Sequence, residues 1–301
     1  MKLIEEINRL KKERNAVILA HNYQRPEIQN IADFVGDSLG LSEEAKRTNA
    51  DVIVFCGVDF MAETAATLNP EKTVLIPDLS AICPMAMMLT PEKIIKAKKK
   101  YPTAQVVLYV NSSAESKAMA DCVCTSANAD KVVNSMTSDT VIFGPDKNLG
   151  YYVKKRSSKK IVCIPEEGVC PTHHQISKED IVIAREKHPK AKFIAHPEVI
   201  PEVQEISEYI ASTEGMIEYC RNSQEREFII GTENGIINRL KRECPGKEFY
   251  PVSDSAICPP MKMITLRKLR DSLKEMKFKI KIPEEVSSMA RDAINCMLKI
   301  R

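Results

Sequence analysis

Three cysteines at a regular interval are the clearest candidates for chemistry in this chain. Cys83, Cys170 and Cys258 are 87 and 88 residues apart, and each precedes a proline in the segments TVLIPDLSAICPM, IVCIPEEGVCPTH and EFYPVSDSAICPPM. Thiolates are preferred ligands of zinc and of iron–sulfur clusters, and the proline stiffens each loop. If the fold brings the three loops together, they predict a metal centre. The alternative is that each cysteine is a small buried hydrophobic residue.

Three cysteines would leave one iron of a 4Fe–4S cluster without a protein ligand. Clusters that only transfer electrons are more often held by four cysteines. An iron with an open position can instead act as a Lewis acid, which binds a hydroxyl or carboxylate group and eases the loss of hydroxyl as water. The number of cysteines therefore favours dehydration or condensation over electron transfer.

The interval between these cysteines recurs in residues of other types. Three further sets keep it, with spacings of 87 and 87, 88 and 86, and 87 and 88 residues: Gly57, Gly144 and Gly231; Ser38, Ser126 and Ser212; Thr90, Ser177 and Thr265. Landmarks that share one register predict an internal triplication. Because equivalent loops of three repeats can meet at one axis, the triplication favours the metal hypothesis for the three cysteines.

The other seven cysteines do not keep this register. Cys122 and Cys124 form a C-x-C pair without counterparts in the other repeats, so we leave them out of the site. The remaining five are expected to be core or incidental residues: Cys56, Cys163, Cys220, Cys244 and Cys296. Ten cysteines in such a chain argue against a disulfide framework and for metal binding, catalysis or core packing.

Polar residues lie at the end of the first apolar run of each repeat. The runs AVILA, QVVLYV and KFIA end in, or are followed by, these pairs: His21 and Tyr23, Tyr109 and Asn111, His196 and Glu198. A lone histidine after a strand is more often structural than catalytic. Three polar pairs at equivalent positions favour a shared functional site.

Four hydroxyl residues are expected at helix N-termini, namely Ser38, Ser126, Ser212 and Thr213. Free backbone N–H groups and the helix dipole favour a carboxylate or phosphate there, although simple N-capping is also compatible. Three such positions around one axis predict a small polyanionic substrate. For His173 and His174, which closely follow Cys170, substrate contact and surface exposure stay open.

Strands and helices alternate within each repeat, which is typical of parallel sheets. Unbroken apolar runs suit strands that are buried on both faces. We predict an α/β fold of three homologous modules, with short parallel sheets in a pseudo-threefold arrangement around a central cavity. The expected modules are 1–90, 91–177 and 178–265, followed by a C-terminal helical tail, 266–301, that packs on an earlier module.

The composition excludes several classes of protein. Lys and Arg number 44 against 41 Asp and Glu, and the net charge of +3 is too balanced to indicate nucleic-acid or membrane binding. No apolar run approaches the roughly 20 residues that cross a bilayer. The N-terminal segment indicates an amphipathic helix and lacks the features of a signal peptide. We expect a cytoplasmic protein that acts on small molecules, without a nucleic-acid or membrane partner.

Several stretches between about residues 15 and 265 resemble the quinolinate synthase family. They include AHNYQRPEIQNIADFVGDSLGLS, LYVNSSAESKAMADCVCTSAN, FGPDKNLG, GVCPTHH, AHPEV and SDSAICPPMKM. The resemblance implies three modules around one oxygen-sensitive 4Fe–4S cluster per chain, held by Cys83, Cys170 and Cys258. It also implies that iminoaspartate condenses with dihydroxyacetone phosphate to quinolinate, with loss of phosphate and two waters. An oxidase or dehydrogenase would supply the iminoaspartate.

By the same resemblance, ten residues line the substrate cavity: His21, Tyr23, Ser38, Tyr109, Asn111, Ser126, His196, Glu198, Ser212 and Thr213. Glu198 and Tyr23 resemble the family's proton-transfer residues, with His21 and Tyr109 as further catalytic candidates. We expect burial to raise the pKa of Glu198 toward the range of a general base. Its alternative role is to orient His196 or to cap the helix after Pro201.

The chain departs from some members of this family at two places. It has Val199 where some members have cysteine, and CPPM where some have C-x-x-C-x-x-C near the third cluster ligand. Neither departure changes a cluster ligand. They put thiol regulation in doubt, but not activity.

Two other functions compete with this interpretation. A diphthamide-synthesis type of enzyme also has three modules and a three-cysteine 4Fe–4S cluster, but uses S-adenosylmethionine. The motifs HNYQ, GDSLGLS and HPE favour the quinolinate synthase family over it. The second alternative is a non-enzymatic structural protein that binds zinc or a cluster.

Overall fold

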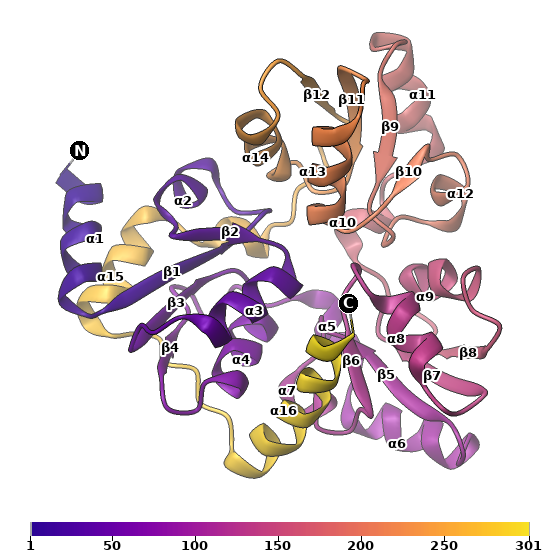
Figure 1. Cartoon of the computed structure of the whole chain (residues 1–301), viewed down its shortest axis with the longest axis horizontal. Coiled ribbons are helices and arrows are strands. Elements are labelled where there is room, and N and C mark those ends of the chain that lie inside the picture. The colour runs from indigo at the N-terminus through magenta and orange to yellow at the C-terminus, as the bar shows by residue number, and fades with distance from the viewer. Residues whose placement is uncertain (1, 301) are drawn as a thin grey trace.

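The computed structural model describes residues 2–300, whose strands form three separate four-stranded parallel sheets. Their strand orders are β2-β1-β3-β4, β6-β5-β7-β8 and β10-β9-β11-β12. The identical order confirms the predicted α/β fold of three modules, which surround the middle of the molecule in Figure 1. We number them modules 1, 2 and 3 in chain order. The strands are β1 (Ala16–His21), β2 (Phe34–Gly36), β3 (Val52–Cys56), β4 (Thr73–Leu75), β5 (Gln105–Tyr109), β6 (Cys122–Cys124), β7 (Thr140–Gly144), β8 (Lys160–Cys163), β9 (Lys192–Ala195), β10 (Tyr209–Ile210), β11 (Glu227–Gly231) and β12 (Glu248–Pro251).

The apolar runs of the sequence are the two central strands of each sheet. In module 1, Ile18 of β1 pairs with Val54 of β3, and both side chains are fully buried. All five residues of β3 are buried, as expected for a parallel strand covered on both faces. Fully burying a side chain such as Ile or Val contributes roughly 1.5–3 kcal/mol, so these strands hold each module together.

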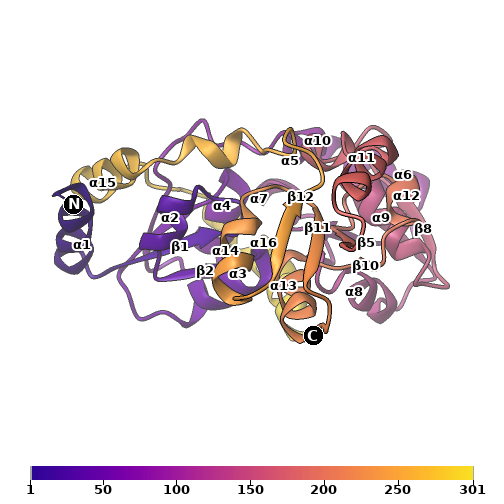
Figure 2. The same cartoon turned by 90° about the horizontal axis from the view of Figure 1, so that it is seen from above.

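Helices connect the parallel strands. They are α1 (Lys2–Glu13), α2 (Pro26–Ile31), α3 (Ser38–Arg47), α4 (Asp59–Leu68), α5 (Pro84–Met88), α6 (Pro91–Lys100), α7 (Ala114–Lys117), α8 (Ala129–Ser135), α9 (Lys147–Lys154), α10 (Pro171–His174), α11 (Lys178–Lys187), α12 (Pro201–Gln204), α13 (Thr213–Asn222), α14 (Ile236–Glu243), the 3₁₀-helix η1 (Pro260–Met263), α15 (Leu266–Glu275) and α16 (Glu284–Lys299). Helices α5 and α10 begin at the proline after Cys83 and Cys170, and Figure 2 shows both on one face of a flattened molecule. Across residues 2–300, none of the helices combines the length and apolarity that a membrane span requires.

Three buried side chains connect neighbouring modules. Gln29, Lys117 and Gln204 are 88 and 87 residues apart, and each lies in the helix after the first strand of its module. Each donates a hydrogen bond to a backbone carbonyl of a different module: Gln29 to Gly235 at 2.9 Å, Lys117 to Phe60 at 3.4 Å and Gln204 to Asn148 at 2.9 Å. Because module 1 donates to module 3, module 3 to module 2 and module 2 to module 1, the modules form a closed ring.

The C-terminal segment packs on modules 1 and 2. Helix α15 lies beside α1 and contacts β3, whereas α16 contacts α4, α7 and β6 (Figure 1). Helix α15 begins 88 residues after α11, which itself begins 87 residues after α6. It therefore repeats the helix that precedes the first strand of a module. Since α1 already fills that position in module 1, α15 lies next to it.

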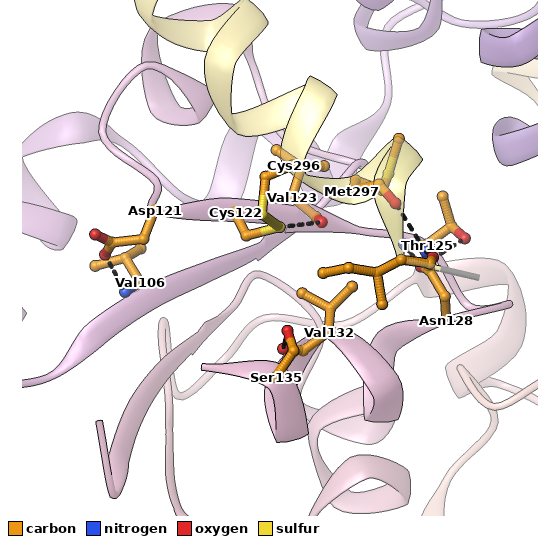
Figure 3. Close-up of a disulfide and its surroundings, with 11 residues drawn as sticks. Val106, Asp121, Cys122, Val123, Thr125, Asn128, Val132, Ser135, Cys296 and Met297 are labelled. Atoms are coloured by element: carbon orange, nitrogen blue, oxygen red, sulfur yellow. Dashed lines mark hydrogen bonds between the residues drawn. A yellow bond between two sulfur atoms is a disulfide. The ribbon is translucent and has the colours of Figure 1, made fainter. Parts of the chain in front are cut away.

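The structure contains a disulfide that the sequence analysis does not predict. Cys122 of β6 is bonded to Cys296 of α16, across 174 residues of sequence and with the two Cα atoms 5.4 Å apart (Figure 3). The expectation that Cys296 is a core or incidental residue is therefore wrong. Cys124, two residues further along β6, is a free buried cysteine. Packing of α16 on β6 brings the pair together, and no local sequence pattern records that contact.

We expect removal of this disulfide to lower the free energy of unfolding by about 2–4 kcal/mol, because the unfolded chain then loses a cross-link that closes a long loop. Urea unfolding of the parent, with and without a reductant, measures the effect. The double variant Cys122→Ser with Cys296→Ser should match the reduced parent and should not respond to the reductant. An equal loss of stability in parent and variant on adding reductant would show that another group is responsible.

Candidate active site

One pocket is lined by side chains from all three modules. It contains the three in-register cysteines, Cys83, Cys170 and Cys258, each half-buried and free. It also contains every polar residue predicted for the site except Ser212, namely His21, Tyr23, Ser38, Tyr109, Asn111, Ser126, His196, Glu198 and Thr213. The structure therefore places the two sets of sequence candidates in one cavity.

The first strand of each module positions two of these side chains. His21 and Tyr109 are the last residues of β1 and β5, and His196 directly follows β9. Two residues further on lie Tyr23, Asn111 and Glu198, respectively. Because loops at the carboxyl ends of parallel strands form the sites of α/β proteins, the three sheets direct these pairs into one pocket.

The two strand-end histidines share one hydrogen-bonding arrangement. Nδ1 of His21 accepts from the backbone N–H of Tyr23 at 3.2 Å, and Nδ1 of His196 accepts from that of Glu198 at 3.4 Å. Burial lowers the pKa of both imidazoles to about 3, so both are neutral at neutral pH. The proton of each therefore resides on Nε2, which in His196 lies 3.0 Å from the hydroxyl of Ser126.

Glu198 lies buried among histidines. Its Oε2 is 2.7 Å from Nδ1 of His173 and 3.6 Å from Nδ1 of His196. Burial raises the pKa of the carboxyl, but the His173 imidazole and the Tyr109 hydroxyl outweigh burial and hold the pKa below its usual range. The predicted upward shift is therefore wrong in direction. Glu198 is ionised at neutral pH and can accept a proton.

A line of short contacts connects Glu198 with Tyr23 through His173 and Thr232. Nε2 of His173 lies 2.7 Å from Oγ1 of Thr232, and that oxygen is 2.6 Å from the hydroxyl of Tyr23. His173 is buried in the pocket, whereas His174 is exposed, so surface exposure holds for His174 and not for His173. Thr232 is a residue that the sequence analysis misses, although it directly follows the in-register Gly231.

The predicted helix N-caps are displaced by one or more residues in modules 1 and 2. The N-cap of α3 is Asp37, which accepts from the backbone N–H of Gly40 at 2.9 Å, and Ser38 is the first helical residue. Asn128 occupies the N-cap position of α8 without a side-chain capping bond, so Ser126 lies before the helix. The expected N-cap positions of Ser38 and Ser126 are therefore wrong.

In module 3 the N-cap is Ser212, as predicted, and it accepts from the backbone N–H of Gly215 at 3.3 Å. Thr213, not Ser212, lines the pocket beside the hydroxyls of modules 1 and 2. The pocket hydroxyls Ser38, Ser126 and Thr213 keep the spacing of 88 and 87 residues better than the set with Ser212 does. That closer register is the signal that could have separated the capping residue from the pocket residue.

The arrangement of thiols bears on which metal group fits the pocket. Within residues 2–300, the side chains whose ligand atoms all lie within 4.8 Å of one another form one group, Cys170, His173 and Glu198, and the three cysteines do not form another. A zinc ion bound by three thiolates at 2.3 Å would need sulfur atoms about 3.8 Å apart. At least two of the three thiols are therefore farther apart than a single zinc ion requires.

Burial raises the pKa of all three thiols, that of Cys258 to about 11. The thiols therefore stay protonated at neutral pH until a metal displaces the protons. Fold and pocket together define a three-module α/β protein with a thiol-lined candidate active site.

Comparison with known proteins identifies the family. Residues 5–299 match the family described as the quinolinate synthetase A protein. The quinolinate synthase of Methanosarcina barkeri is 56% identical over 299 residues, which are 99% of this chain and 98% of that protein. Those of Pyrococcus horikoshii and Thermodesulfovibrio yellowstonii are 55% identical over 300 residues and 52% identical over 297, covering 99% and 98% of those proteins and 100% and 99% of this chain.

The chain belongs to the quinolinate synthetase A family and is an enzyme of NAD biosynthesis. Enzymes of this family use a 4Fe–4S cluster. Membership of this family counts against both competing functions, because the match extends over residues 5–299.

Proposed function

We propose that this chain condenses iminoaspartate with dihydroxyacetone phosphate to form quinolinate, releasing phosphate and two waters. One observation carries the proposal: thiols, a carboxylate, imidazoles and hydroxyls from the strand ends of three modules line a single pocket. Relatives named quinolinate synthase support quinolinate as the product.

We propose that Cys83, Cys170 and Cys258 hold the 4Fe–4S cluster. Their equivalent positions, their common pocket and their separation beyond what one zinc ion needs support this assignment. When bound, the cluster supplies an iron with an open position, which is a Lewis acid for the departure of hydroxyl groups.

The anionic groups of the substrates would bind beside the pocket hydroxyls of Ser38, Ser126 and Thr213. Ser38 and Thr213 are the first residues of α3 and α13, two helices of 10 residues whose N-termini favour negative charge. Two buried side-chain oxygens in the pocket, Oδ1 of Asn111 and Oε1 of Glu198, have no hydrogen-bond partner among residues 2–300. Because buried polar atoms are normally paired, these oxygens are available to substrate groups.

Proton transfer would use the carboxylate and its neighbours. Ionised Glu198 accepts a proton from a carbon beside the carbonyl or imine of the substrate, and His173 and Thr232 connect it to the hydroxyl of Tyr23. The neutral imidazole of His21, with its proton on Nε2, donates a hydrogen bond to a substrate oxygen. Nε2 of His196 lies 3.0 Å from the hydroxyl of Ser126, so these two groups act together. The hydroxyl of Tyr109 helps to hold the pKa of Glu198 low, which favours its ionised form.

An anaerobic assay tests the proposed reaction. The reconstituted protein is mixed with dihydroxyacetone phosphate and with iminoaspartate generated from oxaloacetate and ammonia, and quinolinate and phosphate are measured. We expect equal amounts of both products, and none from protein that lacks iron. Phosphate release without quinolinate would contradict the proposed condensation.

In the cell, an oxidase or dehydrogenase that produces iminoaspartate would supply the first substrate. Spectroscopy distinguishes this reaction from that of a diphthamide-synthesis type of enzyme, which uses S-adenosylmethionine. Addition of S-adenosylmethionine should leave the absorbance and the electron paramagnetic resonance spectrum of the cluster unchanged. A spectral change on adding it would favour radical chemistry instead.

A further inference from the structure

Three acidic residues outside the proposed proton path keep the register of the repeats. Asp59, Asp146 and Glu233 are 87 and 87 residues apart, and each lies two residues after an in-register glycine, in the segments GVD, GPD and GTE. The sequence analysis uses the glycines but misses the acids. Only Glu233 lines the pocket, so direct contact with substrate does not explain why all three positions are acidic.

Each acid holds the backbone of one in-register cysteine. The N–H of Cys83 donates to Oδ1 of Asp59 at 2.9 Å, that of Cys170 to Oδ2 of Asp146 at 3.0 Å, and that of Cys258 to Oε1 of Glu233 at 3.2 Å. Each bond joins the loop after the third strand of a sheet to the loop after its fourth strand. The same contact thus occurs three times, once beside every thiol.

The acids are themselves fixed in place. The second oxygen of Asp146 accepts from the N–H of Leu149 at 2.7 Å, which caps α9. The second oxygen of Glu233 accepts from the N–H of Gly235 at 2.7 Å, and Lys262 lies 2.8 Å from its first oxygen. Asp59 is the first residue of α4. A carboxylate held by a helix start is a rigid acceptor for the cysteine loop.

Two of the three cysteines, Cys83 and Cys170, have nearly identical backbone conformations. Cys83 has φ −78° and ψ 115°, and Cys170 has φ −79° and ψ 114°. The residue after each cysteine is proline, which has no N–H, so the cysteine N–H is the last backbone donor before the thiol loop turns into its helix. A carboxylate on that donor therefore fixes the backbone from which the thiol projects.

We propose that Asp59, Asp146 and Glu233 are positioning residues that hold the three cysteine thiols at the separation a cluster needs, before the cluster is present. This inference rests on the proposed ligation of the cluster by three cysteines and adds the residues that position those cysteines. We assign none of the acids as a ligand of iron, and Asp59 and Asp146 do not line the pocket. They act through the backbone N–H groups of the cysteines.

Asp59 gives the sharpest test, because an amide can replace its acceptor oxygen. Asp59→Ala removes the acceptor, whereas Asp59→Asn keeps an oxygen at the same place. In reconstituted protein, loss of the cluster to an iron chelator should be faster in Asp59→Ala by on the order of 10-fold to 100-fold, since a hydrogen bond to a charged group is worth roughly 1.5–3 kcal/mol. Asp59→Asn should stay within a few-fold of the parent.

Asp180→Ala is a matched control, because Asp180 stabilises the start of α11 through a capping box away from the cysteines. It should lose stability without faster cluster loss. Cluster loss at the parental rate in Asp59→Ala, or equally fast loss in Asp180→Ala, would overturn the proposal. So would a defect in Asp59→Asn as large as that in Asp59→Ala.

A second measurement needs no cluster. Hydrogen exchange of the Cys83 amide in the full-length, metal-free chain should be on the order of 10-fold faster in Asp59→Ala, while the Cys170 amide of the same protein is unchanged. Unchanged exchange at Cys83 would overturn the positioning role. If exchange responds as expected but the parent binds no cluster on these cysteines, the proposed ligation is wrong, whereas the hydrogen bond between Asp59 and the Cys83 N–H is confirmed.

Discussion

Serine in place of Cys83, Cys170 or Cys258 should leave the chain unable to hold a 4Fe–4S cluster. A hydroxyl is a far poorer ligand for iron than a thiolate, and a cluster with only two protein ligands is easily lost. The three thiols lie in equivalent loops of one pocket, and within residues 2–300 no further cysteine lines it. Iron and sulfide analysis and the visible absorbance of anaerobically reconstituted variants measure the effect.

The controls are cysteines outside the register. Cys56, Cys163 and Cys244 do not line the pocket, and their replacement by serine should leave a full complement of iron. Cys56 is fully buried in β3, so that variant is expected to be less stable but still loaded. A cluster that survives in Cys170→Ser would contradict the proposed ligation.

Glu198→Gln should lower the rate of quinolinate formation on the order of 10²–10⁴-fold, the usual contribution of a general base. Gln keeps the size of the side chain and an acceptor for His173, which lies 2.7 Å away, but it cannot accept a proton from carbon. The variant should keep its cluster, bind substrate and accumulate a condensed, incompletely dehydrated intermediate. Chemical quench followed by mass spectrometry detects that species.

Glu205→Gln serves as the matched control, because Glu205 is exposed in the same module and pairs with Lys155 at the surface. It should retain parental activity. Turnover of Glu198→Gln within a few-fold of the parent would assign Glu198 an architectural role, and Tyr23 or His21 would then be the next candidates for the base.

The strands, the three-module fold and the cysteines could be predicted because each leaves a local signal that repeats. Runs such as Val52–Cys56 are apolar throughout, and Cys83, Cys170 and Cys258 stand beside a proline in every repeat. The disulfide to Cys296 could not be predicted, because it depends on where a helix outside the repeats packs.

The direction of the Glu198 pKa shift depends on side chains that meet only in the folded chain. Burial alone raises the pKa of a carboxyl, and the sequence predicts burial. His173 belongs to module 2 and reaches Glu198 of module 3 across the pocket, where its imidazole reverses the effect. Likewise, Asp59, Asp146 and Glu233 are visible in the sequence, but their common purpose appears only with their hydrogen bonds to the cysteines.

The closed ring of donors formed by Gln29, Lys117 and Gln204 has a consequence for how such a site can arise. A single module whose interface donates on one side and accepts on the other would assemble as a homotrimer, since a heterologous interface that closes after three copies needs no other partner. In that trimer every position around the axis would carry the same residue. Three cysteines would suit such symmetry, but a base and its proton donor would not. Repeats that are joined in one chain can differ, as Tyr23, Asn111 and Glu198 do at equivalent places, so one pocket combines three identical thiols with three different polar side chains.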